Sequence, residues 1–266
     1  MLRTRDPLSN DQLYRAAPSI FANAAHESRS ERYTYIPTIH VVDKLREQGF
    51  LPFAVSQSNA RTADKRGHTK HMIRLRQASG WDVEVGGEVN EIIMINSHDG
   101  TSSYRMMPGV FRVVCKNGLV SGKCDSEIRI HHKGSVIDNV IDGAFRVVED
   151  FAMVANQKEA MKDINLAPAE RLLFAQQALT LKYDAAHGTA PVTDQQVLTV
   201  RRTADAASDL WSTFNVVQEN LIKGGIRVRN ANGGRTATRA VTGIDQDVKL
   251  NRALWALAEG MRALKA

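Results

Sequence analysis

The sequence predicts an α+β fold, with an antiparallel β-meander in the N-terminal half and a mainly helical C-terminal half that contains a basic, Gly-rich hairpin. From Phe50 to about Ile141, short apolar stretches alternate with clusters of Gly, Asn, Asp and Ser, which is typical of strands and turns. After Ile137 the apolar residues recur every three or four positions, which is typical of helices. Hydrophobic residues make up 43% of the 266 positions, so the chain can bury a real core.

The expected organisation has three parts: a polar, loop-like segment at 1–37, an α+β sheet region at 38–145 and a mainly helical region at 146–266. We expect the last two to form one continuous domain. A short helix is predicted from Thr38 to about Gln48. Thr38 is expected to be its N-cap, and Gly49 stands where a C-terminal glycine belongs.

The remaining elements follow from apolar patterning and capping residues. Strands are predicted at Leu51–Ser56, His68–Gln77, Glu88–Asn96, Ser102–Met107 and Val110–Cys115. Helices are predicted at Ile137 to about Met161, from Pro168 towards Tyr183, from Thr193 or Asp194 to Val200, and over the apolar repeats Leu210–Leu221 and Leu250–Leu264.

The predicted strand His68–Gln77 has two different faces, because successive side chains point to opposite sides of a sheet. Ile73 and Leu75 fall on an apolar face, and Lys70, Arg74 and Arg76 fall on the other. The loop before the strand adds Arg61 and Arg66. The cationic side chains are interpreted either as a solvated sheet face or as a groove that follows a phosphate backbone.

A second basic region runs from Lys223 to Arg239 and contains no acidic residue. Asn232-Gly-Gly is a hairpin-turn signal, which predicts a two-stranded ribbon. Arg227 and Arg229 would then share a face on one strand, and Arg235 and Arg239 would share a face on the other. The alternatives are a nucleic-acid-binding ribbon and a solvent-exposed linker. Tyr33 and Tyr35 are the candidates for stacking on unpaired bases.

The segment from Asn96 to Leu119 offers possible ligands for chemistry, but its spacing favours turns. Asn96-Ser-His-Asp-Gly100 and Asn117-Gly118 both follow apolar runs, and these residue types favour tight turns. Cys115 ends an apolar run and is expected to be a buried residue. No phosphate-loop, dinucleotide-binding or hydrolase motif occurs. We therefore assign no catalytic residue, no metal ligand and no cofactor.

The stretches NSHDG, GVFRVVCKNGLVSG, LWSTFNVVQENLIKGG and LNRALWALAEG resemble a large phage- and plasmid-like protein family of unknown function. The resemblance covers about Tyr33 to Leu257 and implies a protein encoded by a mobile element. It supplies no catalytic residues. A more distant similarity, carried by the β-meander and the cationic strand, is to phage single-strand annealing proteins of the RecT/ERF kind.

The leading hypothesis is a DNA-binding protein that binds single-stranded DNA and anneals complementary strands. A net charge of +6 favours a polyanionic partner, and annealing requires no cofactor. The N-terminus has no apolar run and no stretch approaches ~18 apolar residues, so a cytoplasmic protein without a membrane partner is expected. Such proteins usually act as homo-oligomers. The alternatives are a metal-dependent nuclease using His98, Asp99 and His131, and an anti-defence or adaptor protein that binds a host protein.

Overall fold

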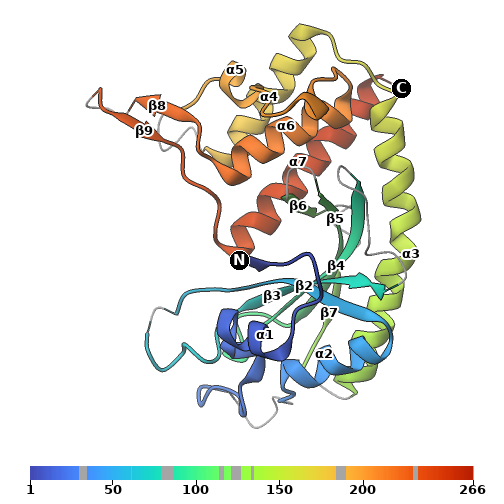
Figure 1. Ribbon diagram of the computed structural model, residues 1–266, viewed down its shortest axis with the longest axis vertical. Coiled ribbons are helices and arrows are strands. Elements are labelled where there is room, and N and C mark those ends of the chain that lie inside the picture. Colours follow the sequence, from blue (N-terminus) through green and yellow to red (C-terminus); the bar gives the residue numbers. More distant parts are fainter. Residues whose placement is uncertain are drawn as a thin grey trace. The chain divides into compact units, whose positions relative to one another are not determined.

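The computed structural model describes residues 1–29, 35–60, 62–78, 87–113, 117–120, 127–132, 135–183, 190–229 and 233–265. Within it the chain divides into two compact units, Met1–Phe151 and Ala152–Ala266 (Figure 1). The α+β class predicted from the sequence is confirmed, with the antiparallel sheet in the first unit and helices with a short basic hairpin in the second.

The first unit contains an antiparallel sheet in which β1 to β6 are neighbours in chain order and β7 also pairs with β5. The strands are β1 (Leu2–Arg3), β2 (Phe50–Gln57), β3 (His71–Gln77), β4 (Glu88–Asn96), β5 (Tyr104–Arg112), β6 (Asn117–Val120) and β7 (Ile128–Ile130). Its helices are α1 (Asn10–Ala16), the 3-10 turn η1 (Pro18–Phe21), α2 (Thr38–Glu47) and the first part of α3 (Val136–Lys162). This order confirms the predicted meander.

One face of the sheet packs against helices to form the core of the first unit. On β3, β4 and β5 the core side chains alternate along the strand, as Ile73 and Leu75 do on β3. Helix α3 contributes Val136, Val140, Ala144 and Val147, whose spacing of four, four and three residues places them on one helical face. The predicted division of the β3 side chains between two faces of the sheet therefore holds.

One gap between predicted strands and one predicted turn are instead parts of strands. Strand β5 runs without a break through Pro108-Gly109, where the sequence predicted two strands. Pro108 lies between the part of β5 paired with β7 and the part paired with β6, so its missing N–H interrupts neither pairing. Asn117 and Gly118 were predicted to form a hairpin corner, but they belong to β6 and pair with Arg112 and Phe111.

The N-terminal region contributes to the core, which corrects the loop-like character expected for residues 1–37. Leu13 of α1 and Ile20 of η1 are both fully buried. Helix α2 begins at the predicted Thr38, but its N-cap is Pro37, so the predicted capping role of Thr38 is wrong. Gly49 has a φ of 81° just after the helix and fills the predicted C-terminal position.

The second unit is a group of helices that carries a basic ribbon. It contains the rest of α3, α4 (Pro168–Lys182), α5 (Asp194–Val197), η5 (Thr203–Asp205), α6 (Leu210–Lys223), the strands β8 (Arg227–Arg229) and β9 (Arg235–Ala237), and α7 (Ile244–Lys265). Trp211 and Phe214 of α6 pack against Trp255 of α7, with ring centroids 6.2 and 5.9 Å apart. Pro168 begins α4 and Thr193 caps α5, as the sequence predicts.

None of the described helices combines the length and apolar character needed to cross a membrane. The predictions of a single continuous domain and of a homo-oligomer stay predictions.

Candidate nucleic-acid interface

The β8–β9 ribbon places three arginines on one face. Arg229 lies opposite Arg235 in the antiparallel register, and Arg227 lies opposite Ala237. Because directly opposed residues share a face and alternate residues return to it, Arg227, Arg229 and Arg235 point to the same side. All three are exposed. The predicted hairpin is confirmed by this pairing, and residues 230–232 between its strands lie outside the described residues.

The charge of this face is not compensated within the ribbon. No acidic residue occurs between Lys223 and Ile244. Like charges directly opposite each other on a sheet are destabilising, so the Arg229–Arg235 pair costs stability in the free protein. A bound polyanion would relieve this repulsion. Arg239 is exposed beyond the end of β9, so it continues the basic character of this arm without being part of the strand.

An open pocket of about 840 Å³ lies beside the ribbon. It is lined by Gln196 of α5 together with Arg227, Val228, Arg229, Arg235 and Thr236. Gln196 donates a hydrogen bond from Nε2 to the carbonyl of Arg227 at 3.3 Å, so α5 supports one strand of the ribbon. In Figure 1 the ribbon projects away from the helices of its unit.

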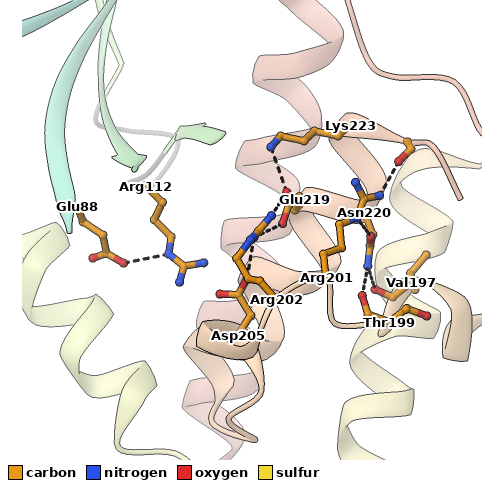
Figure 2. A network of polar contacts seen from close by, with 11 residues as sticks. Glu88, Arg112, Val197, Thr199, Arg201, Arg202, Asp205, Glu219, Asn220 and Lys223 are labelled. Carbon is orange, nitrogen blue, oxygen red and sulfur yellow. Dashed lines mark hydrogen bonds and ion pairs between the residues drawn. The ribbon is translucent and has the colours of Figure 1, made fainter. Parts of the chain in front are cut away.

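The ribbon has two arms: the first leads from Gly224 into β8, and the second leads from β9 to Arg239. Arg201 anchors the first arm (Figure 2). Its Nε donates to Oδ1 of Asn220 at 2.6 Å, and its Nη2 donates to the carbonyl of Gly224 at 2.5 Å. Asn220 in turn donates to the carbonyls of Val197 and Thr199. The segment that follows α5, the end of α6 and the start of the ribbon are thereby joined through two side chains.

Lys182 anchors the second arm. Its Nζ donates to the carbonyl of Leu221 at 2.5 Å and to the carbonyl of Arg239 at 3.2 Å. Burial lowers the pKa of Lys182 from its usual value. Gly224 lies where the arms meet, with a φ of 61°, and a Cβ built there would stand 2.6 Å from the carbonyl oxygen of Thr238. The root of the ribbon therefore requires a glycine and is held from both sides.

A charged cluster fixes the segment around Arg202 to α6. Both Nη atoms of Arg202 donate to Glu219 at 2.6 Å, and Nη1 also donates to Asp205 at 2.7 Å. Burial acts to raise the pKa of Glu219, but hydrogen bonds from Arg202 and Lys223 outweigh it and hold that pKa below its usual value. Lys223 lies 3.0 Å from Glu219, so this cation of the basic region belongs to the support of the ribbon.

The second predicted cationic surface, on β3, has its two arginines buried and not exposed. Arg74 and Arg76 are 1% and 4% exposed, and both pair with Glu91, which is fully buried. The guanidinium of Arg76 also lies between the rings of Phe53 and Phe111, 4.5 Å from each centroid. The prediction of an accessible cationic face is therefore wrong for these two arginines, since their charge is used inside the fold.

The other residues predicted for this surface have varied surroundings. Lys70 is half-buried just before β3, and Arg66 is exposed in the preceding loop. Arg61 and Tyr33 lie outside the described residues. Tyr35 is half-buried, its hydroxyl donates to the carbonyl of Ala22, and burial raises its pKa to about 12. Its ring also packs edge-on against His98, so Tyr35 is already engaged within the fold.

A buried polar cluster around Thr38 was not predicted from the sequence. The Thr38 hydroxyl lies 3.0 Å from each of three atoms: Nε2 of His71, Nε2 of His98 and Nδ2 of Asn96. Nδ1 of His71 lies 2.8 Å from the Ser19 hydroxyl and 3.3 Å from the carbonyl of Thr69. Because the carbonyl only accepts and the hydroxyl can accept, we assign the proton of His71 to Nδ1. Thr38 then donates to His71 and accepts from Asn96 and His98. The network fastens the start of α2 to strands β3 and β4.

Burial lowers the pKa of His71 to about 4 and the pKa of His98 to about 2. The nearby histidines His71, His132 and His68 lower the pKa of His98 further, and Asp99 opposes the shift in both residues. Both imidazoles are therefore neutral at pH 7. The sequence signal for this cluster was the position of His71 on the apolar face of its strand.

The segment Asn96–Gly100 has the turn chemistry that the sequence indicated. Oδ1 of Asp99 accepts hydrogen bonds from the backbone N–H and the hydroxyl of Thr101, and Gly100 has a φ of 77°. His98 is fully buried, whereas His131 is exposed. Across the described residues, no group of three or more His, Cys, Asp or Glu is placed to hold a metal ion. Cys115 lies outside the described residues.

Comparison with known proteins identifies relatives without a stated activity. The family model described as "Domain of unknown function (DUF932)" matches residues 25–255. The chain is 51% identical over 259 residues to the UPF0380 protein YfjQ of Escherichia coli (strain K12), covering 97% of this chain and 93% of that protein. It is 50% identical over 261 residues to the UPF0380 protein YafZ of the same strain, covering 98% and 94%. No solved structure matches. The predicted membership in a family of unknown function is thus confirmed: the chain belongs to the DUF932 family.

Proposed function

We propose that this protein binds nucleic acid through the arginine face of the β8–β9 ribbon and acts in the replication or recombination of a mobile element. The observation that carries the proposal is the direct opposition of Arg229 and Arg235 on an exposed ribbon without acidic residues. Such a face attracts a phosphate backbone, whose neutralisation supplies most of the affinity of sequence-independent binding.

The arrangement supports binding and positioning. Arg227, Arg229 and Arg235 are fixed charges, and Gln196 adds an amide at the edge of the same pocket. The hypothesis of single-strand annealing also named Tyr33 and Tyr35 as candidates for aromatic stacking. Tyr35, one of its two candidates, hydrogen-bonds through its hydroxyl and packs against His98. Charge neutralisation by the ribbon is therefore the part of the hypothesis that the geometry supports best.

The proposal is tested by measuring the affinity for labelled oligonucleotides by fluorescence anisotropy between about 50 and 200 mM salt, a range over which phosphate contacts weaken strongly. The test variant carries R227Q, R229Q and R235Q. The matched control carries R5Q, R15Q and K249Q, which remove the same charge from exposed positions elsewhere. Circular dichroism checks that all three proteins are folded.

We expect the ribbon variant to bind more weakly, with a slope of log affinity against log salt that is smaller by about two to three. The control should keep the slope of the unchanged protein, apart from a small general effect of net charge. Absence of binding at ~50 mM salt, or equal slopes for the two variants, contradicts the proposal. A mass measurement of the same samples tests the predicted homo-oligomer.

A further inference from the structure

The shape of the ribbon indicates which class of nucleic acid it fits. This inference rests on the proposed function. We infer that the β8–β9 ribbon enters the major groove of a B-form DNA duplex. Two antiparallel strands lie about 4.8 Å apart. With side chains on both faces, such a ribbon matches the B-DNA major groove, which is about 12 Å wide and 8.5 Å deep. The major groove of an A-form RNA helix is deep and too narrow for side chains to read.

Both faces of the ribbon are available to line a groove. The three residues of β9 are all exposed, and on β8 only Val228 is half-buried. The face opposite the arginines carries Val228 and Thr236, which are directly opposed in the register. A methyl-bearing face suits contact with thymine methyl groups, and a threonine hydroxyl can bond to base edges. The arginine face can contact phosphates or the O6 and N7 atoms of guanine.

The composition of the ribbon argues against a platform for unpaired bases. Proteins that bind single strands without sequence preference stack successive bases on aromatic side chains. The segment between Lys223 and Ile244 contains no aromatic residue. Without a stacking surface, the ribbon can use phosphate contacts, groove shape and hydrogen bonds to base edges, and all three are present in a duplex.

The root of the ribbon is built to hold its direction. Arg201 bonds to the carbonyl of Gly224 in the first arm, and Lys182 bonds to the carbonyl of Arg239 in the second. Between them, the N–H of Gly225 donates to the carbonyl of Thr238, and the N–H of Thr238 donates to the carbonyl of Ile226. A ribbon held in this way loses less conformational freedom when it enters a groove than an unanchored loop would.

The test compares four probes of about 24 nucleotides with the same base sequence: a DNA duplex, one of its single strands, the corresponding RNA duplex, and a DNA duplex whose cytosines carry glucosylated hydroxymethyl groups at C5. These glucosyl groups fill the major groove and leave the phosphate backbone in place. Affinities are measured at one salt concentration for the unchanged protein, for R227Q/R229Q/R235Q and for the control R5Q/R15Q/K249Q.

We expect the plain DNA duplex to bind at least tenfold more tightly than the other three probes. The control variant should keep this preference, and the ribbon variant should lose it. Equal or tighter binding to the single strand, to the RNA duplex or to the glucosylated duplex overturns the groove inference and leaves the proposed function standing. Failure of the unchanged protein to bind any of the four probes overturns both.

Discussion

Nη1 of Arg74 lies 3.1 Å from Oε2 of Glu91, and the two side chains are 1% and 0% exposed. The other carboxylate oxygen of Glu91 accepts a hydrogen bond from Nε of Arg76 at 2.9 Å. One buried carboxylate therefore serves two buried guanidinium groups on the neighbouring strand. Carbonyls of Gly118 and Leu119 accept further hydrogen bonds from Arg74, so this face of the sheet is held together by polar contacts.

Glu91→Gln should destabilise the protein strongly. The substitution keeps the shape of the side chain but removes the negative charge that Arg74 and Arg76 share, and breaking a buried pair in this way typically costs about 3–5 kcal/mol. Chemical denaturation at pH 7 measures the free energy of unfolding. The matched control is Glu47→Gln, which removes the exposed partner of Lys44 and should change stability little. Equal effects of the two substitutions would contradict the buried role of Glu91.

The alternation of residues 71 to 77 was enough to separate the two faces of β3, but the same pattern could not show which cations are accessible. Burial of Arg74 and Arg76 depends on Glu91, which lies 17 and 15 residues away along the chain. It also depends on the phenylalanines of β2 and β5 that enclose Arg76. The ribbon could be predicted because its turn residues and its charges are close together in sequence.

Thr38→Val should destabilise the first unit although the two side chains are nearly the same size. Valine cannot donate to His71 or accept from Asn96 and His98, so three buried polar groups lose a partner. Each buried group left unpaired costs about 1–3 kcal/mol, and relaxation will recover part of the total. Thr242→Val at an exposed position is the control, and its free energy of unfolding should stay close to that of the unchanged protein.

The Thr38 cluster could not be predicted from the sequence because its members come from three separate segments of the chain. Thr38 is separated from His71 by 33 residues and from His98 by 60. A histidine on an apolar face indicates a satisfied core residue, but its partner depends on how α2 crosses the sheet. The same limit explains why Thr38 was assigned to capping, since only the fold shows its hydroxyl turned towards the strands.

Stability should fall as the pH is lowered below about 6.5. The pKa values of His71 and His98 are lowered by burial to about 4 and about 2, below the value of 6.5 expected in the unfolded chain. The unfolded state therefore binds more protons than the native state between these values. The contribution of the two neutral histidines to stability is fully present above about pH 6.5. It is lost on acidification by up to about 1.4 kcal/mol per pH unit for each histidine.

Between pH 6.5 and 5 the change in stability reports on these histidines. Carboxylates such as Glu127 and Glu219, whose pKa values are lowered, affect stability at lower pH. His71→Gln should reduce the slope of unfolding free energy against pH by about one histidine's share. Asp99, His68 and His132 face the same cluster and remain in this variant. His40→Gln, at an exposed position, is the matched control for the substitution. Identical slopes in all three proteins would argue against a neutral, buried His71.

Gly224→Ala should lower the melting temperature more than Gly225→Ala. Both residues have positive φ, so alanine is strained at either position by about 1–3 kcal/mol. Among the described residues, an added Cβ at position 224 also meets backbone atoms, at 2.6 Å from the carbonyl oxygen of Thr238 and 2.7 Å from the carbonyl carbon of Arg239. An added Cβ at position 225 has no described atom within 4 Å. Equal melting temperatures for the two variants would mean that the arms of the ribbon can separate without cost.

Arg201→Gln should weaken the proposed binding to DNA because the ribbon is no longer held in position, and not because a phosphate contact is lost. The substitution removes the hydrogen bonds to Asn220 and to the carbonyl of Gly224 that hold the first arm of the ribbon. We expect a tenfold loss of affinity with little change in the slope of log affinity against log salt, because the ribbon arginines still reach the phosphates. Arg229→Gln is the comparison, and its slope should fall by nearly one. A similar fall in Arg201→Gln would instead place Arg201, which is exposed, on the nucleic acid itself.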